Sequence, residues 1–525
     1  MSIFFNHKAH LSIGATLVSL TLSIGLSGCG GSDSSSSSNT IDAEAPPSLG
    51  NPSLVIPDTY AFENTDGVST VSYTGQTKRH VLINDLTQTL LDEDIASNAA
   101  GESANVLRSL NFYYQFDGDT SDDTESLFML DSQSLIADDD TSPDQAFTYG
   151  QISSGKNLQG KIAGNDPALL DDRFDGWSEG LSANPTPDSL INYWFSEFAN
   201  NVTDGTQTAV PVVDGASFRL EAYDAPYYVD SNGLDYRQLV QKFLSVAVAF
   251  SQGTADYLSI DFGSDENLAL EEGKPYTVGQ HDFDEAFGYF GAARDYDQYT
   301  DSEIKDPSYR DSNNDGSIDI RSEYNFGHST NCAKRDLGSA DDAKTDFTQE
   351  VFDAFLSGRT ILQAAALEGE LTSERETELN QAIEAAALTW EKCIAATVVH
   401  YINDMRAHLD TSSDSNDESV FSASFPAFLS LDDYLVYAKH YSEMKGFALG
   451  LQFSPFSPFR DTATSVDMDD LRLLLSKMAD SPFMPDVDAT SADLDGRMAY
   501  SDALLEARDI LEEAYDFDPI NAAGW

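Results

Sequence analysis

The stretch TSERETELNQAIEAAALTWEKCIAATVVHYINDMRAHL, residues 372–409, decides the fold. Ser373 and Glu376 have the spacing of a capping box, which marks the start of a helix. Behind them an apolar residue recurs every three or four positions, at Leu379, Ile383, Ala386, Trp390, Ile394, Val398, Ile402, Met405 and Leu409. This period is typical of a helix with one buried face. The stretch therefore predicts a long helix packed against a core.

Helical periodicity continues through most of the chain from Tyr60 onward, and strand-like alternation is scarce. Further helices are expected at about 83–94, 103–114, 188–200, 235–252, 281–291, 347–368, 431–450, 467–479 and 500–515. Segments rich in Asp, Gly, Ser and Asn connect them, at 116–185, 204–233, 293–346 and 411–428. The sequence therefore predicts an all-α helical bundle with long acidic loops.

The first residues indicate where the protein works. An apolar run over 11–26 follows Lys8 and ends in Leu26-Ser27-Gly28-Cys29, which is too short and wrongly flanked for a membrane span. It is similar to a bacterial lipoprotein signal, which implies cleavage before Cys29 and a lipid on that cysteine. Gly30 after it, rather than an aspartate, implies an outer-membrane location. The alternative is an ordinary cleaved secretion signal; both place the protein outside the cytoplasm.

The expected organisation follows from these signals. Residues 1–28 are a signal peptide, and 29–58 are a flexible tether rich in Ser, Pro and Gly. Residues 59–525 are the folded helical domain. Lys and Arg total 29 against 89 Asp and Glu, so the surface repels phosphate backbones and nucleic acid is excluded as a partner. Because 41% of the residues are hydrophobic, the chain is not a disordered acidic tail.

The cysteines agree with an oxidising compartment. Once Cys29 carries a lipid, Cys332 and Cys393 form an even pair, for which one disulfide is an option. Neither has a second cysteine two to four residues away, so the spacing matches no zinc pattern. We expect a structural role for both.

Two segments place an imidazole and carboxylates one helical turn apart. His281 is followed by Asp284 and Glu285, and His440 is followed by Glu443. Facing helices in bundles can bring such groups to one ion, and imidazole with carboxylate suits iron or zinc. The alternative is a helix N-terminus whose acids complement the helix dipole.

Four other histidines are not expected at this site. His400 is expected in the core, and His80 at the surface. His328 and His408 lack a partner at ligand spacing.

The first segment resembles the signature of imelysin-type proteins, in which glycine, any residue, histidine, two residues and glutamate follow one another. Gly279 and His281 fit, but Asp284 stands in the glutamate position and Glu285 comes one residue later. More closely, the chain resembles an imelysin-related family of bacterial lipoproteins catalogued only as a domain of unknown function. The residues that carry this resemblance are 72–77, 157–164, 281–291, 322–327, 395–403 and 440–449. It covers about 60–515 and implies an imelysin-like helical fold and a link to iron uptake.

A third segment, DSNNDGSID, follows the first nine positions of a calcium loop. Its expected oxygen ligands are Asp311, Asn313, Asp315, Ser317 and Asp319. Gly316 allows the sharp turn at position six. Position twelve is Ser322, and Glu323 comes one residue late for the bidentate ligand. The alternative is a solvated turn that binds nothing.

The sequence therefore predicts an outer-membrane lipoprotein that binds a metal ion, iron or zinc, and serves in iron acquisition together with envelope iron-uptake components. Two alternatives stay open: a binding or scaffold lipoprotein stabilised by calcium alone, and a metallopeptidase-like hydrolase. The chain has no His-Glu-x-x-His helix and no Gly-x-Ser-x-Gly elbow, so enzymatic activity is the weaker expectation.

Overall fold

The computed structural model describes residues 54–130, 135–136, 144–204, 225–306, 308–409, 421–422, 425–428, 430–484 and 491–525. These residues belong to one compact unit. The expected signal peptide, Cys29 and almost all of the tether lie outside the described residues. No helix in the described ranges is long and apolar enough to cross a membrane.

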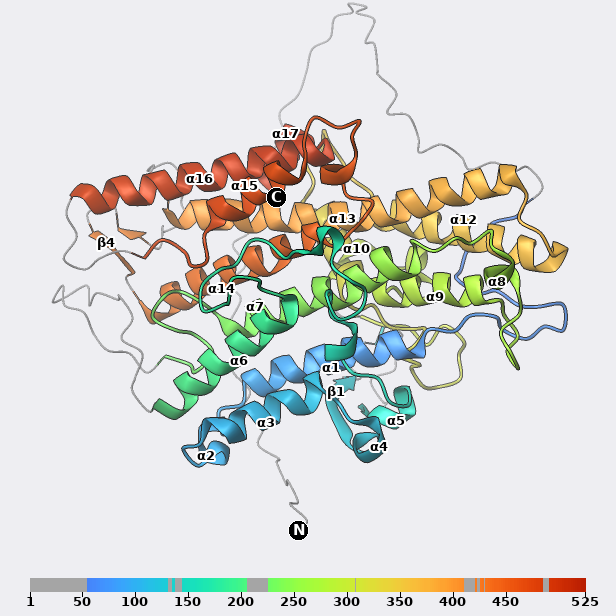
Figure 1. Ribbon diagram of the computed structural model, residues 1–525, viewed down its shortest axis with the longest axis horizontal. Coiled ribbons are helices and arrows are strands. Elements are labelled where there is room, and N and C mark those ends of the chain that lie inside the picture. Colours follow the sequence, from blue (N-terminus) through green and yellow to red (C-terminus); the bar gives the residue numbers. More distant parts are fainter. Residues whose placement is uncertain are drawn as a thin grey trace, which may run out of the picture. The chain divides into compact units, whose positions relative to one another are not determined.

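Helices make up most of the unit, so the all-α prediction is confirmed (Figure 1). The α-helices are α1 (Thr74–Leu90), α2 (Ile95–Ala99), α3 (Ser103–Tyr114), α4 (Gly118–Ser121), α5 (Tyr149–Ile152), α6 (Pro187–Asp204), α7 (Tyr236–Leu244), α8 (Asp265–Leu268), α9 (Val278–Phe290), α10 (Asp301–Lys305), α11 (His328–Gly338), α12 (Phe347–Glu368), α13 (Ser373–Leu409), α14 (Leu431–Ala448), α15 (Met468–Met478), α16 (Ser491–Tyr515) and α17 (Pro519–Gly524).

The other elements are short. Two antiparallel hairpins are formed by β1 (Glu125–Leu130) with β2 (Gln145–Thr148) and by β3 (Phe421–Ser422) with β4 (Phe425–Phe428). The 3₁₀ turns are η2 (Gln159–Lys161), η3 (Leu170–Asp172), η6 (Tyr296–Gln298), η7 (Leu449–Gln452) and η8 (Pro458–Arg460).

The long helix α13 is the centre of the unit. It packs along α12, α14, α16 and α11 (Figure 1). All nine residues of its predicted apolar stripe are buried, which confirms the stripe. The cap lies one residue earlier than expected, because Thr372 Oγ1 accepts the N–H of Arg375 (3.4 Å). At the end of α12, Gly369 adopts a left-handed conformation (φ 80°), which turns the chain back toward α13.

Helix α7 continues into two π-helical segments, η4 (Ser245–Phe250) and η5 (Gln252–Tyr257). Such i→i+5 segments are rare and are usually single turns. Glycine at position 253 is required by packing, since a Cβ there would lie 2.6 Å from the Trp390 ring. The run therefore lies directly against α13 at the centre of the core.

The sequence located most of the long helices but missed α11 and several short ones, among them α10 and α17. Helices α3 and α12 have the expected bounds, whereas α11 lies inside 293–346, which was expected to be a connection. The β1–β2 hairpin likewise falls within the expected connection 116–185. Helix α11 has few apolar residues, HSTNCAKRDLG, and its N-cap Gly327 provides no side-chain cap. It therefore lacks both signals that mark a helix in a sequence.

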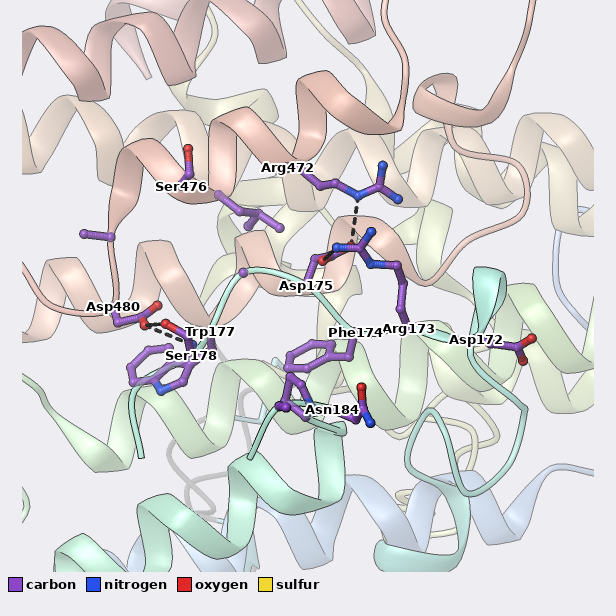
Figure 2. A pocket seen from close by; sticks show the side chains of 15 residues that line it. Asp172, Arg173, Phe174, Asp175, Trp177, Ser178, Asn184, Arg472, Ser476 and Asp480 are labelled. Atoms are coloured by element: carbon purple, nitrogen blue, oxygen red, sulfur yellow. Dashed lines mark hydrogen bonds and ion pairs between the residues drawn. The ribbon is translucent and has the colours of Figure 1, made fainter. Parts of the chain in front are cut away.

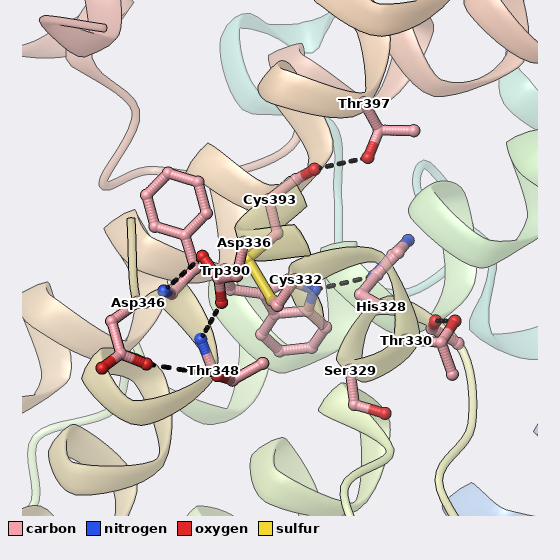
Figure 3. The surroundings of a disulfide bond; sticks show 12 residues. His328, Ser329, Thr330, Cys332, Asp336, Asp346, Thr348, Trp390, Cys393 and Thr397 are labelled. Atoms are coloured by element: carbon pink, nitrogen blue, oxygen red, sulfur yellow. Dashed lines mark hydrogen bonds between the residues drawn. A yellow bond between two sulfur atoms is a disulfide. The ribbon is translucent and has the colours of Figure 1, made fainter. Parts of the chain in front are cut away.

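Cys332 on α11 and Cys393 on α13 form a disulfide (Figure 3). A second contact joins α11 to the start of α12. The Asp336 carboxylate accepts hydrogen bonds from the backbone N–H groups of Phe347 and Thr348 at 2.9 Å each. These contacts fix α11 against both α12 and α13.

A buried acid on α13 predicts a pH-dependent gain in stability. Glu391 has no exposed surface, and burial raises the pKa of its carboxyl from 4.5 to about 7; Tyr515 Oη donates a hydrogen bond to it (2.7 Å). Above pH 7 the folded state must hold a buried charge, at a cost of about 3 kcal/mol. Glu391→Gln is therefore expected to raise the unfolding free energy at pH 8, as measured by urea denaturation.

The gain should shrink as the pH falls from 7 toward 4.5, because the carboxyl is then neutral in the folded state as well. Unfolding curves at pH 8 and pH 5 test this directly. An equal effect of Glu391→Gln at both pH values would contradict the assignment.

Candidate functional site

The structure separates the two acids that follow His281 on α9. The side chain of Asp284 has no exposed surface. Its carboxylate accepts hydrogen bonds from Tyr60 Oη (2.9 Å), Arg359 Nε (2.7 Å) and the N–H of Ser72 (3.2 Å). The oxygens of Asp284 thus hold the N-terminal segment and α12 together, whereas the sequence placed them with His281 and Glu285 as candidate metal ligands.

His281 and Glu285 face each other on the outer side of α9. The Nδ1 atom of His281 lies 3.0 Å from the carbonyl oxygen of Ser72, which only accepts, so the neutral ring carries its proton on Nδ1. Nε2 keeps its lone pair and lies 3.7 Å from Glu285 Oε1. Tyr276 stacks on the ring, with centroids 4.9 Å apart. These two side chains are the part of the expected α9 site that stays available to a metal.

His440 and Glu443 lie one turn apart on α14 but have different partners. His440 Nδ1 is 3.0 Å from His408 Nε2 on α13, whereas Glu443 lies 3.4 Å from Lys242 Nζ on α7. The first turn of α9 lies next to α8, at the opposite side of the view from α14 (Figure 1). The structure therefore does not bring the two histidine segments together, and Glu443 is a partner for a lysine.

A histidine cluster that the sequence interpretation missed joins α13 to α14. His400, Asp404 and His408 follow one another at four-residue spacing on α13, and His440 comes from α14. The Nε2 atoms of His400 and His440 lie 3.4 and 3.7 Å from the same oxygen, Oδ2 of Asp404. Burial, as the largest cause, lowers the pKa of His400 to about 3 and that of His440 to about 4. Both rings are therefore neutral at pH 7.

The expectation that His408 lacks a partner is wrong, since it contacts His440. Its four-residue spacing from Asp404 was the signal available in the sequence. Across the described ranges, no group of three or more His, Cys, Asp or Glu side chains could hold a metal ion as placed. The cluster would therefore need side-chain rotation to close around an ion.

The loop at Asp311–Asp319 curls as a calcium loop does at its start. Asn314 and Gly316, at positions four and six, have φ of 59° and 87°. Within the curl, the Asp311 carboxylate accepts the N–H groups of Asp315 (3.0 Å) and Gly316 (2.8 Å). The glycine at position six thus has the role that the sequence predicts.

Two later acids of the loop are already paired. Both carboxylate oxygens of Asp319 accept from the Arg321 guanidinium, at 2.7 and 2.9 Å. Glu323 accepts the N–H of Ser312 on Oε1 (2.9 Å) and that of Asp319 on Oε2 (2.8 Å). The side-chain oxygens of Asp311, Asn313 and Asp315 accept hydrogen bonds from within the loop itself, and with Ser317 they remain the candidate ligands.

A pocket of about 790 Å³ lies between the 172–185 segment and α15 (Figure 2). Three of its charged groups pair with one another: Asp175 contacts Arg173 and lies 3.0 Å from Arg472 Nε. Asp480 Oδ2 accepts hydrogen bonds from the N–H (2.9 Å) and Oγ (2.7 Å) of Ser178. These contacts hold the segment against α15, and we assign the pocket a structural role.

A serine–histidine pair lies at the junction of η4 and α11, with His328 buried and Ser245 partly buried; Figure 3 shows His328 beside Trp390. His328 Nδ1 accepts a hydrogen bond from Trp390 Nε1 (2.7 Å), so the proton of the neutral ring is on Nε2. Nε2 therefore donates to Ser245 Oγ (3.2 Å) and cannot take its proton. A hydrolytic triad needs the reverse arrangement, with an acceptor at Nδ1. The pair is not a nucleophile and base.

No curated protein and no solved structure is significantly similar to this chain. One family model matches, and it spans from just before α6 to just beyond α13, which includes α9 and α11 but neither α1 nor α14. His281 and His400 thus fall inside the matched region, and His440 outside it. Residues 178–417 of this chain match the family described as a domain of unknown function, DUF4856.

Proposed function

We propose that the chain is a metal-binding lipoprotein of the bacterial cell envelope, with the metal held between α13 and α14. The observation that supports it is the position of two neutral imidazoles, His400 and His440, against one oxygen of Asp404. Ligand atoms around a tetrahedral zinc lie about 3.3 Å apart, which follows from metal–ligand bonds of about 2.0 Å. The distances of 3.4 and 3.7 Å are close to that separation.

The donor set fits a transition metal. Two imidazoles with one carboxylate suit iron or zinc better than calcium, which prefers oxygen ligands. The hydrogen bond between His408 and His440 Nδ1 would orient the ring of His440 and leave its Nε2 for the ion. A metal held in this way would be captured or handed over to iron-uptake components of the envelope.

Metal content of the soluble form that starts after the serine tract tests the proposal, measured by mass spectrometry. The parent is expected to carry iron or zinc near one equivalent, and His440→Ala is expected to lose most of it. The reason is that the alanine variant loses one of three protein ligands. In a partly exposed site only water can take the place of that ligand.

His281→Ala is the matched control, because it also removes a half-buried imidazole beside a carboxylate. It should retain the metal. Loss with His281→Ala and retention with His440→Ala would move the site to α9, and a parent free of iron and zinc would contradict the proposal.

Calcium binding at Asp311–Asp319 is a second candidate, favoured by the two left-handed residues at positions four and six. We expect 5 mM calcium, taken as roughly 100 times the dissociation constant, to add about 2.7 kcal/mol to stability. Thermal melting with calcium and with magnesium measures this, and Asp311→Asn should remove the difference. Equal melting in both ions would exclude the loop.

The anchor belongs to the same proposal. A lipid on Cys29 and a tether over 29–58 would hold the helical unit at the outer membrane, within reach of envelope partners. We further propose that the chain is related to imelysins, and the support for this is its helical fold. The reversed polarity at His328 argues against serine hydrolysis, so we propose binding without turnover.

A further inference from the structure

A second pocket, of about 270 Å³, lies between α1, α7, α11 and the end of α14. Its apolar wall contains the rings of Phe128, Tyr324, Phe326 and Phe447. Its polar wall includes Lys242, Lys334, Asn325 and two histidines. Within the described part of the chain no Asp or Glu lines it, although acids outnumber Lys and Arg by 89 to 29 in the sequence. The pocket is thus cationic in a strongly acidic protein.

Lys334 gives the pocket a positive charge that no ion pair balances in the described ranges, whereas the charge of Lys242 is balanced. Lys242 lies 3.4 Å from Glu443, which balances it, but no carboxylate in the described ranges forms an ion pair with Lys334. Burial, followed by the charge of Lys242, lowers the pKa of Lys334 to about 8. An anion in the pocket would offset both the cost of the buried charge on Lys334 and its repulsion by Lys242.

A buried donor in the wall is also without an acceptor. Asn325 is 3% exposed, and its Oδ1 accepts the N–H of Ala293 (2.8 Å), which fixes the orientation of the amide. Its Nδ2 has no hydrogen-bond partner in the described structure. A buried amide without a partner costs about 1–3 kcal/mol, so a ligand oxygen at this point would stabilise the fold.

Helix α11 begins at the pocket. Its first residue, His328, lines the wall, and its N-cap has no side-chain hydrogen bond, so the helix dipole adds positive potential. His80, expected at the surface, is instead buried here, with its ring stacked on Phe326 and Nε2 3.2 Å from the carbonyl of Gly288. Gly327 is exposed and Lys334 is partly exposed, which leaves a route from solvent.

We infer that this pocket binds a small organic carboxylate, with its anionic end at Lys334 and Asn325 and its apolar body against the aromatic wall. The unpaired lysine and the unpaired amide favour a negatively charged hydrogen-bond acceptor. The four aromatic rings favour a ligand with an apolar body. Inorganic phosphate satisfies the first requirement and not the second.

Isothermal titration of the full-length protein in detergent with benzoate, benzamide and phosphate tests the inference. We expect benzoate to bind, and benzamide and phosphate to bind at least about tenfold more weakly. Benzamide lacks the negative charge, and phosphate lacks the apolar ring. Lys334→Met and Asn325→Asp should each lower the benzoate affinity by about tenfold or more. Asp at 325 keeps the acceptor for Ala293 but repels the anion.

Lys274→Met is the control, since it removes the same charge from an exposed position outside the pocket lining. It should bind benzoate as the parent does. Absence of benzoate binding in the millimolar range would overturn the inference. So would unchanged affinity in either pocket variant with a parent-like melting curve, or equal binding of phosphate. Because the metal candidates lie elsewhere, their failure leaves this result interpretable.

Discussion

Replacing Asp284 with asparagine is expected to lower the free energy of unfolding by about 3–5 kcal/mol. The substitution keeps the shape of the side chain and removes its charge. Arg359, which has no exposed surface and donates to Asp284 at 2.7 Å, would then be a buried cation without a counter-ion. Guanidinium denaturation of parent and variant measures the loss.

Two further variants distinguish the contribution of the buried Asp284–Arg359 pair to stability from that of the outer face of α9. Glu285→Gln should change stability by less than about 1 kcal/mol, because its side chain is partly exposed and faces His281 across 3.7 Å. Combining Asp284→Asn with Arg359→Met should recover part of the loss, since the uncompensated charge is gone. A parent-like stability of Asp284→Asn alone would show that the pair contributes little.

Removing the disulfide is expected to have a comparable effect. Cys332 and Cys393 are 61 residues apart, and a closed loop of this length restricts the unfolded chain by about 4 kcal/mol. The double variant Cys332→Ala, Cys393→Ala should therefore unfold at lower denaturant concentration than the oxidised parent. Chemical denaturation under identical buffer conditions measures the difference.

The reduced parent is the control for this prediction, because it has the same side-chain volumes without the bond. It should lie close to the double variant, with a small difference from packing. The prediction fails if reduction leaves the denaturation midpoint unchanged and the native protein already has free thiols at Cys332 and Cys393 before reduction. The disulfide would then not be formed in solution.

The part of the fold that could be predicted is the part in which a side-chain period is clear. The stripe from Leu379 to Leu409 has one phase over its whole length, so α13 and its buried face follow from sequence alone. Helix α11 could not be predicted in this way. It is held by the disulfide and by Asp336, contacts with residues that are distant in sequence.

The candidate site shows the same limit. The sequence placed His281, Asp284 and Glu285 on one helix, but only tertiary contacts decide that Asp284 turns to Arg359 and Glu285 to His281. The His440 and Glu443 spacing was correct as a helical turn, yet His440 contacts another histidine and Glu443 a lysine. The spacing of residues along one helix predicts which of them are neighbours on that helix. It does not predict which residues of other helices they contact.

The two π-helical segments change the direction of the side chains along the helical run that begins with α7. A π turn holds more residues than an α turn, so each one rotates the outward direction of later side chains relative to an ideal α-helix. Before these turns α7 packs on α1, α6 and α14; after them η5 packs on α9. The helical run from α7 to η5 therefore turns one side toward α1, α6 and α14 and another side toward α9.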